Sequence, residues 1–114
     1  MAKLYEPTHP AVLQLIARTA RAAEKNGIWT GICGEMASDL RYIPILIGLG
    51  VEELSMSPIS IGHARRLIRK ISMTDAEQIA ARALQASTAK EALRYSTEFL
   101  ERNVPEILAA VREG

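Results

Sequence analysis

The chain has 114 residues, enough for one domain with a modest hydrophobic core, and its 48% hydrophobic and 24% charged residues are ordinary for a globular protein. Basic and acidic residues nearly balance, at 14 and 13, so the charge pattern predicts neither a nucleic-acid nor a membrane partner. The longest apolar run, from Ile43 to Leu49, is too short to cross a bilayer. No leader-like segment is visible and one cysteine cannot form an internal disulfide, so we expect a cytoplasmic protein.

The first predicted elements are a helix and a strand. Residues 10–26 carry apolar side chains at three- and four-residue steps, which predicts a helix with Thr8 as its N-cap. Asn26-Gly27 is its stop signal, because glycine adopts the left-handed conformation without a Cβ penalty. Residues 28–32 have the β-branched and aromatic character of a buried strand.

A second helix, a second strand and a third helix are predicted next. The second helix is expected to begin near Ser38-Asp39 and to end by Gly48, with Pro44 in its first turns, where proline is tolerated. Its free N–H groups would favour an anion. The second strand is expected at residues 51–56 and the next helix at residues 60–71.

The remainder of the chain, residues 72–114, is predicted to be helical. Thr74 with Glu77, and Thr88 with Glu91, both match the capping box that opens a helix. Pro105 is expected to open a last short helix or to kink the one before it. The predicted order is therefore helix, strand, helix, strand, helix and then two or three further helices.

The alternation of helices with strands predicts an α/β fold with parallel strands. A complete (β/α)8 barrel takes about 250 residues, so this chain is too short to form one. Reacting groups in such folds gather at the carboxyl ends of the strands, where Cys33 and residues 55–57 would lie. Taken alone, however, a lone cysteine is more often a small buried hydrophobe, and the two serines, Ser55 and Ser57, are more often turn or cap residues. His9 and His63 have no partners at metal-ligand spacing, so no metal site is predicted.

Five segments in order give the chain a resemblance to a known family: Leu4-Tyr5-Glu6-Pro7, His9-Pro10-Ala11-Val12, Gly31-Ile32-Cys33-Gly34-Glu35-Met36-Ala37, Gly48-Leu49-Gly50 and Glu53-Leu54-Ser55-Met56-Ser57-Pro58-Ile59-Ser60-Ile61. They resemble the C-terminal part of the phosphoenolpyruvate (PEP)-binding TIM-barrel domain of PEP-utilising enzymes. Within that family they are most similar to phosphoenolpyruvate-protein phosphotransferase, enzyme I of the sugar phosphotransferase system.

The resemblance implies a partial TIM barrel, made of the last two βα units in a single fragment-like domain over residues 1–114, with residues 72–114 as a helical tail. It implies that Cys33 is the acid that delivers a proton to C3 of enolpyruvate, with Gly34 and Glu35 as further contributors to the substrate loop. A thiol suits this role, because it is largely protonated at neutral pH yet acidic enough to protonate an enolate. Glu35 and Asp39 are expected to favour the neutral thiol through their negative charge.

The resemblance also indicates what the chain lacks. Family members hold the phosphate and carboxylate of the substrate with arginines, and chelate magnesium with acidic residues, from earlier barrel strands. No cofactor is therefore assigned to this chain, and PEP or pyruvate is expected only in a complete barrel.

Two main functions follow. The first is a C-terminal fragment or truncated homologue of the phosphotransferase, a transferase that is inactive alone. The alternative is a non-catalytic interaction module that self-associates through exposed strand edges and apolar faces, so a homo-oligomer is expected. A small-molecule binder at Cys33 is a third reading.

Overall fold

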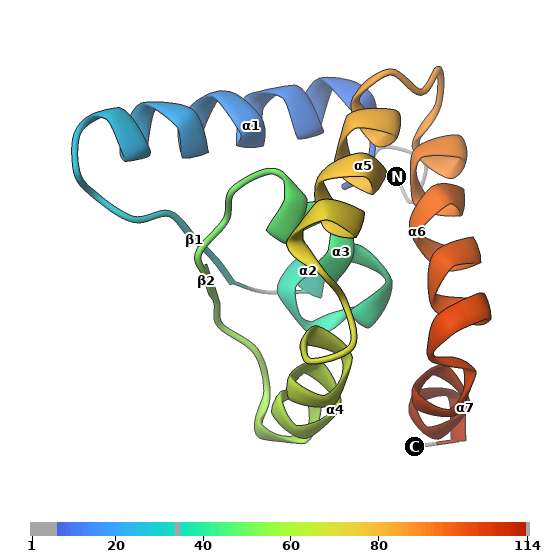
Figure 1. Ribbon diagram of the computed structural model, residues 1–114. Helices are drawn as coiled ribbons and strands as arrows, with labels where there is room; N and C mark the ends of the chain where they lie inside the picture. Colours follow the sequence, from blue (N-terminus) through green and yellow to red (C-terminus); the bar gives the residue numbers. More distant parts are fainter. Residues whose placement is uncertain (1–6, 34, 114) are drawn as a thin grey trace.

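The fold is described from a computed structural model, which covers residues 7–33 and 35–113; side chains are described except those of residues 35 and 111–113. Within these ranges, the elements in chain order are α1 (Pro10–Lys25), β1 (Gly31–Ile32), α2 (Glu35–Ser38), the 3-10 helix η2 (Leu40–Tyr42), α3 (Ile43–Gly48), β2 (Glu53–Leu54), α4 (Pro58–Ile68), α5 (Met73–Leu84), α6 (Ala89–Asn103) and α7 (Pro105–Glu113). The predicted order of helices and strands is confirmed, with three helices after α4 (Figure 1).

The start of α1 differs from the prediction. His9, not Thr8, is the N-cap, and its Nδ1 accepts a hydrogen bond from the backbone N–H of Ala11 at 3.0 Å. Thr8 is buried instead, and its hydroxyl donates to the carbonyl of Ala89 at 2.8 Å. A tertiary hydrogen bond to the start of α6 therefore takes the hydroxyl that the sequence pattern assigned to the helix cap.

The end of α1 confirms the predicted stop. Gly27 has a positive φ of 72°, and its N–H donates to the carbonyl of Glu24 at 3.2 Å. The N–H of Ile28 donates to the carbonyl of Ala23 at 2.9 Å. These two bonds form a Schellman motif, which satisfies the free carbonyls at a helix C-terminus and turns the chain sharply away from the helix axis.

The two strands are parallel, as predicted, with Gly31 paired to Glu53 and Ile32 to Leu54. They are much shorter than the predicted residues 28–32 and 51–56. The prediction of a buried first strand was wrong at its start, because Ile28 and Trp29 are each 63% exposed. Among the described residues, pairing with the second strand begins only at Thr30, whose carbonyl accepts from the N–H groups of residues 52 and 53.

The predicted second helix is broken into three pieces. Asp39 has an extended backbone (φ −92°, ψ 112°), and its side chain accepts from the N–H of Arg41. This local bond ends α2 and caps η2, because an aspartate side chain competes with the helical backbone for N–H groups. Pro44 lies in the first turn of α3, as predicted.

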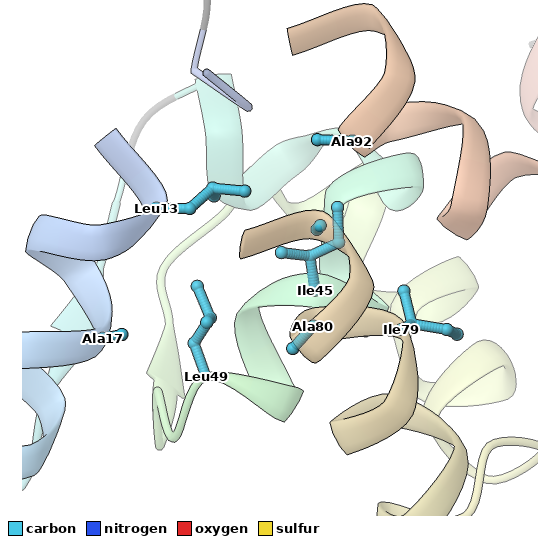
Figure 2. Close-up of a cluster of buried hydrophobic side chains, with 8 residues drawn as sticks. Leu13, Ala17, Ile45, Leu49, Ile79, Ala80 and Ala92 are labelled. Atoms are coloured by element: carbon cyan, nitrogen blue, oxygen red, sulfur yellow. The ribbon is translucent and has the colours of Figure 1, made fainter. Parts of the chain in front are cut away.

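Helix α3 forms the centre of the molecule, with Ile43, Pro44, Ile45 and Leu46 all buried. One hydrophobic cluster joins α3 to α1, α5 and α6 (Figure 2); it consists of Leu13, Ala17, Ile45, Leu49, Ile79, Ala80, Ala83 and Ala92. A second cluster joins η2 and α3 to α4, α6 and α7; it consists of Leu40, Ile43, Ala64, Leu67, Leu100, Val104, Ile107 and Leu108. The small sheet lies to one side, so the molecule is a helix-rich part of an α/β domain.

The last three helices are delimited by caps and a proline. Thr88 caps α6 by accepting from the N–H of Glu91, as predicted, while the Glu91 carboxylate accepts from the N–H of Ser87. The predicted cap at Thr74 was wrong, because Ser72 caps α5 by accepting from the N–H of residue 75 at 3.0 Å. Pro105 opens α7 as a separate helix.

Candidate functional site

The candidate site lies at the carboxyl edge of the two-stranded sheet. Cys33 directly follows Ile32, the last residue of β1, and Ser55 directly follows the last residue of β2. The N–H of Ser55 donates to the carbonyl of Ile32 at 2.8 Å, which fixes the two strand ends side by side. The thiol of Cys33 is free and exposed. The local structure therefore presents this sulfur to a ligand rather than burying it as a small hydrophobe.

The residues after Cys33 are predicted to contribute to the substrate loop and to begin a helix. Gly34 lies outside the described residues, and so does the side chain of Glu35, so the geometry of these two predicted loop contributors is not part of the site described here. Helix α2 has four residues and ends at Ser38, and the 3-10 helix η2 begins at Leu40, close to the predicted helix start. The Asp39 carboxylate accepts the N–H of Arg41, which is one of the N–H groups that were expected to favour an anion.

A rigid ion pair fixes the chain beyond α2. Asp39 Oδ2 lies 2.6 Å from an Nη atom of Arg41, and Arg41 Nε donates to Oδ1 at 3.0 Å. This hydrogen bonding raises the pKa of the Arg41 guanidinium above its ordinary value. The guanidinium also stacks on the Tyr42 ring, 5.6 Å from its centroid.

Sequence reasoning missed the residue that supports this ion-paired turn. The buried hydroxyl of Ser96, on α6, donates to the carbonyl of Arg41 at 2.6 Å. The two residues are 55 positions apart, and a single serine on a helix face gives no local signal for such a contact. The helical tail thus holds the turn that follows the candidate site.

The two serines after β2 are arranged as a strand end and a helix start. Ser57 is the N-cap residue of α4, and its Oγ lies 3.1 Å from the Oγ of Ser60. Ser55 is exposed and contributes its backbone N–H to the sheet. Ser57 therefore begins a helix and Ser55 ends a strand, as expected for cap and turn residues.

Two hollows flank the sheet, one on each side. A hollow of about 170 Å³ lies between α1 and β1, and a larger one of about 550 Å³ lies between β2 and α4. Cys33 lines neither of them. The hydroxyl of Thr30, in the wall of the smaller hollow, is buried without a hydrogen-bond partner in the described part of the chain.

The described residues offer little to a metal ion. In residues 7–33 and 35–113, no three His, Cys, Asp or Glu side chains lie close enough together to hold one. His9 uses its Nδ1 as a helix cap. Over the same part of the chain, no helix has both the length and the apolar character needed to span a bilayer.

Two parallel strands that alternate with helices place the molecule in the class of α/β domains. The family model described as "PEP-utilising enzyme, PEP-binding domain" matches residues 1–73. The chain belongs to this family, which confirms the resemblance seen in the sequence.

Named relatives agree with this assignment. The chain is 44% identical over 96 residues to the phosphoenolpyruvate-protein phosphotransferase of Staphylococcus carnosus (strain TM300), a match that covers 84% of this chain. It is 45% identical over 100 residues to the protein of the same name from Haemophilus influenzae, covering 88% of this chain. The Mycoplasma pneumoniae protein of that name is 42% identical over 99 residues, covering 87%. In each case the match spans only 17% of the relative's length.

Proposed function

We propose that the chain supplies the last two βα units of the PEP-binding barrel of a phosphoenolpyruvate-protein phosphotransferase, and that Cys33 is its proton donor. The observation that supports this most is the exposed thiol directly after Ile32, at the carboxyl edge of a parallel strand pair. TIM-barrel enzymes have their active sites at the carboxyl ends of the barrel strands. Membership of the PEP-utilising family therefore supports a catalytic role for a residue at this position.

The proposed step is a proton transfer that follows phosphoryl transfer. The bond between the phosphoryl group and the enol oxygen of PEP breaks, and a histidine nitrogen outside this chain accepts the phosphoryl group. The electron pair left on the enolate forms a C–H bond at C3 with the proton of the Cys33 thiol, which gives pyruvate. The thiolate then regains a proton from solvent.

We expect the isolated chain to release no pyruvate from PEP. Phosphoryl transfer depends on cationic groups and metal ions that position and neutralise the phosphate. In the described residues the cations nearest in sequence to Cys33 are Lys25 and the ion-paired Arg41, at equal distance on either side, and no acidic cluster suited to magnesium is present. A coupled assay with PEP, magnesium and a histidine acceptor checks this, and pyruvate release above background would contradict it.

A chimaera tests the role of the thiol. The segment of the Staphylococcus carnosus relative that aligns with this chain is replaced by this chain, and pyruvate release is measured. Cys33→Ala in the chimaera is expected to lower kcat by about 10²–10⁴-fold, the range found for loss of a general acid. Ser55→Ala, at the end of the neighbouring strand, is the matched control and should stay within about 2-fold. Equal rates for the two variants would refute the proposed donor.

A second candidate function rests on exposed apolar side chains. Leu15 and Trp29 are each 63% exposed and Ile59 is 83% exposed, which favours a module that self-associates when nothing else covers these side chains. Light scattering over a dilution series separates the candidates. A monomer that stays well folded at every concentration would eliminate self-association without affecting the role of Cys33.

A further inference from the structure

Two buried hydroxyl groups join the helical tail to the rest of the chain. In the described residues the buried polar side chains are Thr8 and Ser96, which are 3% and 0% exposed. The Ser96 hydroxyl, on α6, donates to the carbonyl of Arg41 at 2.6 Å. The Thr8 hydroxyl donates to the carbonyl of Ala89, at the start of α6, at 2.8 Å. A buried hydroxyl without a partner is costly, so each bond fixes the two segments that it joins.

The Arg41 carbonyl lacks the donor that its own helix would normally supply. A 3-10 helix such as η2 joins each carbonyl to the N–H group three residues further on. For Arg41 that residue is Pro44, which has no N–H. The Ser96 hydroxyl is a donor from across the fold. The tail therefore supplies a bond that the local backbone pattern lacks.

The same turn is also held from its exposed side. The Asp39 carboxylate accepts the backbone N–H of Arg41 at 3.0 Å and an Nη–H of its guanidinium at 2.6 Å. Leu40, between these two residues, is 3% exposed and packs in the second hydrophobic cluster. The turn at residues 39–41 is thus fixed by an exposed polar contact, by a buried apolar side chain and by the hydroxyl of Ser96.

This turn is one end of the short segment that carries Cys33. The other end is Ile32, whose carbonyl accepts the N–H of Ser55 at 2.8 Å. Helix α2 lies directly before the turn, and its Ala37 is fully buried. Only one residue of the sequence separates Cys33 from α2. Consecutive Cα atoms are about 3.8 Å apart, so a single residue absorbs little displacement, and a shift of the turn and of α2 reaches the thiol.

We infer that Ser96 is a positioning residue for the Cys33 thiol, because its bond to the Arg41 carbonyl fixes one end of the segment that carries the sulfur. This inference rests on the proposed role of Cys33 as the proton donor. Proton transfer requires the donor to be held against the accepting atom, and a misplacement of about 1 Å can lower a rate about 10²-fold. Ser96 acts through the position of Cys33 and does not touch the substrate.

The first test measures the motion of the segment. Cys33 is the only cysteine of the chain and its thiol is exposed, so a nitroxide spin label attached to it reports this motion by electron paramagnetic resonance. Ser96→Ala should shorten the rotational correlation time of the label about 2-fold or more, because the turn loses its buried bond. Circular dichroism checks that the variant keeps the helical fold.

Thr8→Val is the matched control, because it removes the other buried hydroxyl and keeps the shape of the side chain. This bond joins the chain before α1 to α6 and does not involve the turn at residues 39–41. The motion of the label should therefore stay as in the unmodified chain. An unchanged label in Ser96→Ala, or equal changes in the two variants, overturns the inference.

The chimaera with the Staphylococcus carnosus relative gives a second measurement, and it decides the question if Ser96→Ala does not fold in the isolated chain. In the chimaera Ser96→Ala should lower kcat about 10-fold or more and leave KM within about 2-fold, because it misplaces the proton donor without removing a substrate contact. Thr8→Val should leave both constants within about 2-fold. A rise in KM with an unchanged kcat would overturn the inference.

The failure of this inference is distinguishable from the failure of the proposed function. If Cys33→Ala leaves kcat of the chimaera unchanged, the proposed donor is refuted, and the catalytic role of Ser96 is refuted with it. If Cys33→Ala lowers kcat but Ser96→Ala changes neither kcat nor the motion of the label, only the positioning role of Ser96 is refuted.

Discussion

The part of the chain that matches the family and the helical tail after it differ in how completely they bury their apolar side chains. In the described residues, every large hydrophobic side chain that stays exposed precedes Thr74; these are Val12, Leu15, Ile28, Trp29, Ile59, Ile61, Ile68 and Met73. The tail instead buries Leu100, Val104 and Ile107 completely. In the described residues the tail therefore leaves no large apolar side chain exposed, whereas the family part keeps apolar surface that no element covers.

Helix α3 connects the two regions and explains why they fold together. It contributes Ile45 to the cluster with α1 and α5, and Ile43 to the cluster with α4, α6 and α7. The tail thus buries one side of the family part and leaves the sheet with its flanking hollows open. If the two regions differ in this way, substitutions of side chains buried between them should lower the free energy of unfolding most. Substitutions of the exposed apolar side chains should lower it little.

The largest effect is expected from Leu100→Ala. Leu100 is fully buried in the second cluster, so the substitution should lower the free energy of unfolding by about 2–5 kcal/mol through lost burial and a residual cavity. Leu15→Ala removes the same atoms from a side chain that is 63% exposed and should cost less than about 0.5 kcal/mol. Urea denaturation of both variants in dilute solution checks this. Similar costs would mean that the two regions do not differ as described.

A smaller loss of stability is expected from Gly48→Ala, because Gly48 lies where α3 contacts α5. A Cβ on Gly48 would meet the carbonyl oxygen of Ala76 on α5, and would lie 2.6 Å from the carbonyl carbon and 2.7 Å from Ala80 Cβ. Separating α3 from α5 to relieve this should cost about 1–3 kcal/mol of unfolding free energy.

The matched glycine is Gly62, on α4, where a Cβ would meet nothing within 4 Å. Gly62→Ala should raise the stability by about 0.5–1 kcal/mol, because alanine restricts the unfolded chain and favours the helix. Thermal unfolding of the two variants should therefore give shifts of opposite sign. A stable Gly48→Ala variant would show that α3 and α5 are not in fixed contact.

Substitutions at the helix caps test whether Ser72, and not Thr74, is the N-cap of α5, and the expected changes in unfolding free energy are about 1 kcal/mol. Ser72→Ala and Thr88→Ala each remove a hydroxyl that accepts a backbone N–H, at 3.0 Å and 3.1 Å, so each should lower the stability by about 1 kcal/mol. Thr74→Ala should change it by less than about 0.5 kcal/mol, since Thr74 is not the cap residue. Chemical denaturation that ranked Thr74→Ala with the other two would restore the predicted capping box.

Much of the family part could be predicted because its signals are local. Gly27 terminates α1 through its own φ, and Pro44 falls in a first helical turn, so short-range rules locate both. The position of Cys33 at a strand end follows from the residues on either side of it. The strand lengths could not be obtained in this way, because they depend on hydrogen-bonded neighbours that lie elsewhere in the chain.

The candidate features of the tail escaped prediction for a related reason. Thr8 caps no helix because its hydroxyl reaches Ala89, and Ser96 holds the Arg41 carbonyl across the fold. Both contacts join residues far apart in sequence, and serine or threonine alone does not specify such partners.

The smallest effect expected is a pH dependence located at the start of α6. The pKa of Glu91 lies below its ordinary value, first because its carboxylate accepts the N–H of Ser87 and second because it accepts the hydroxyl of Tyr95. A carboxylate with a lowered folded-state pKa stabilises the fold fully above its unfolded-state pKa, which is near 4.5. This stabilisation should fade as the pH falls below about 4.5 and through the lower folded-state value.

Glu91→Gln isolates that contribution, because the amide keeps an acceptor oxygen but does not titrate in this range. The variant should lose less stability than the unmodified chain between about pH 5 and pH 3, the range around the ordinary glutamate pKa, when both are unfolded with urea. The side-chain carboxyl resonance of Glu91 gives the titration directly. If that resonance titrates at or above the ordinary glutamate value, the Glu91 carboxylate does not accept the Ser87 N–H and the Tyr95 hydroxyl in solution as it does in the structure.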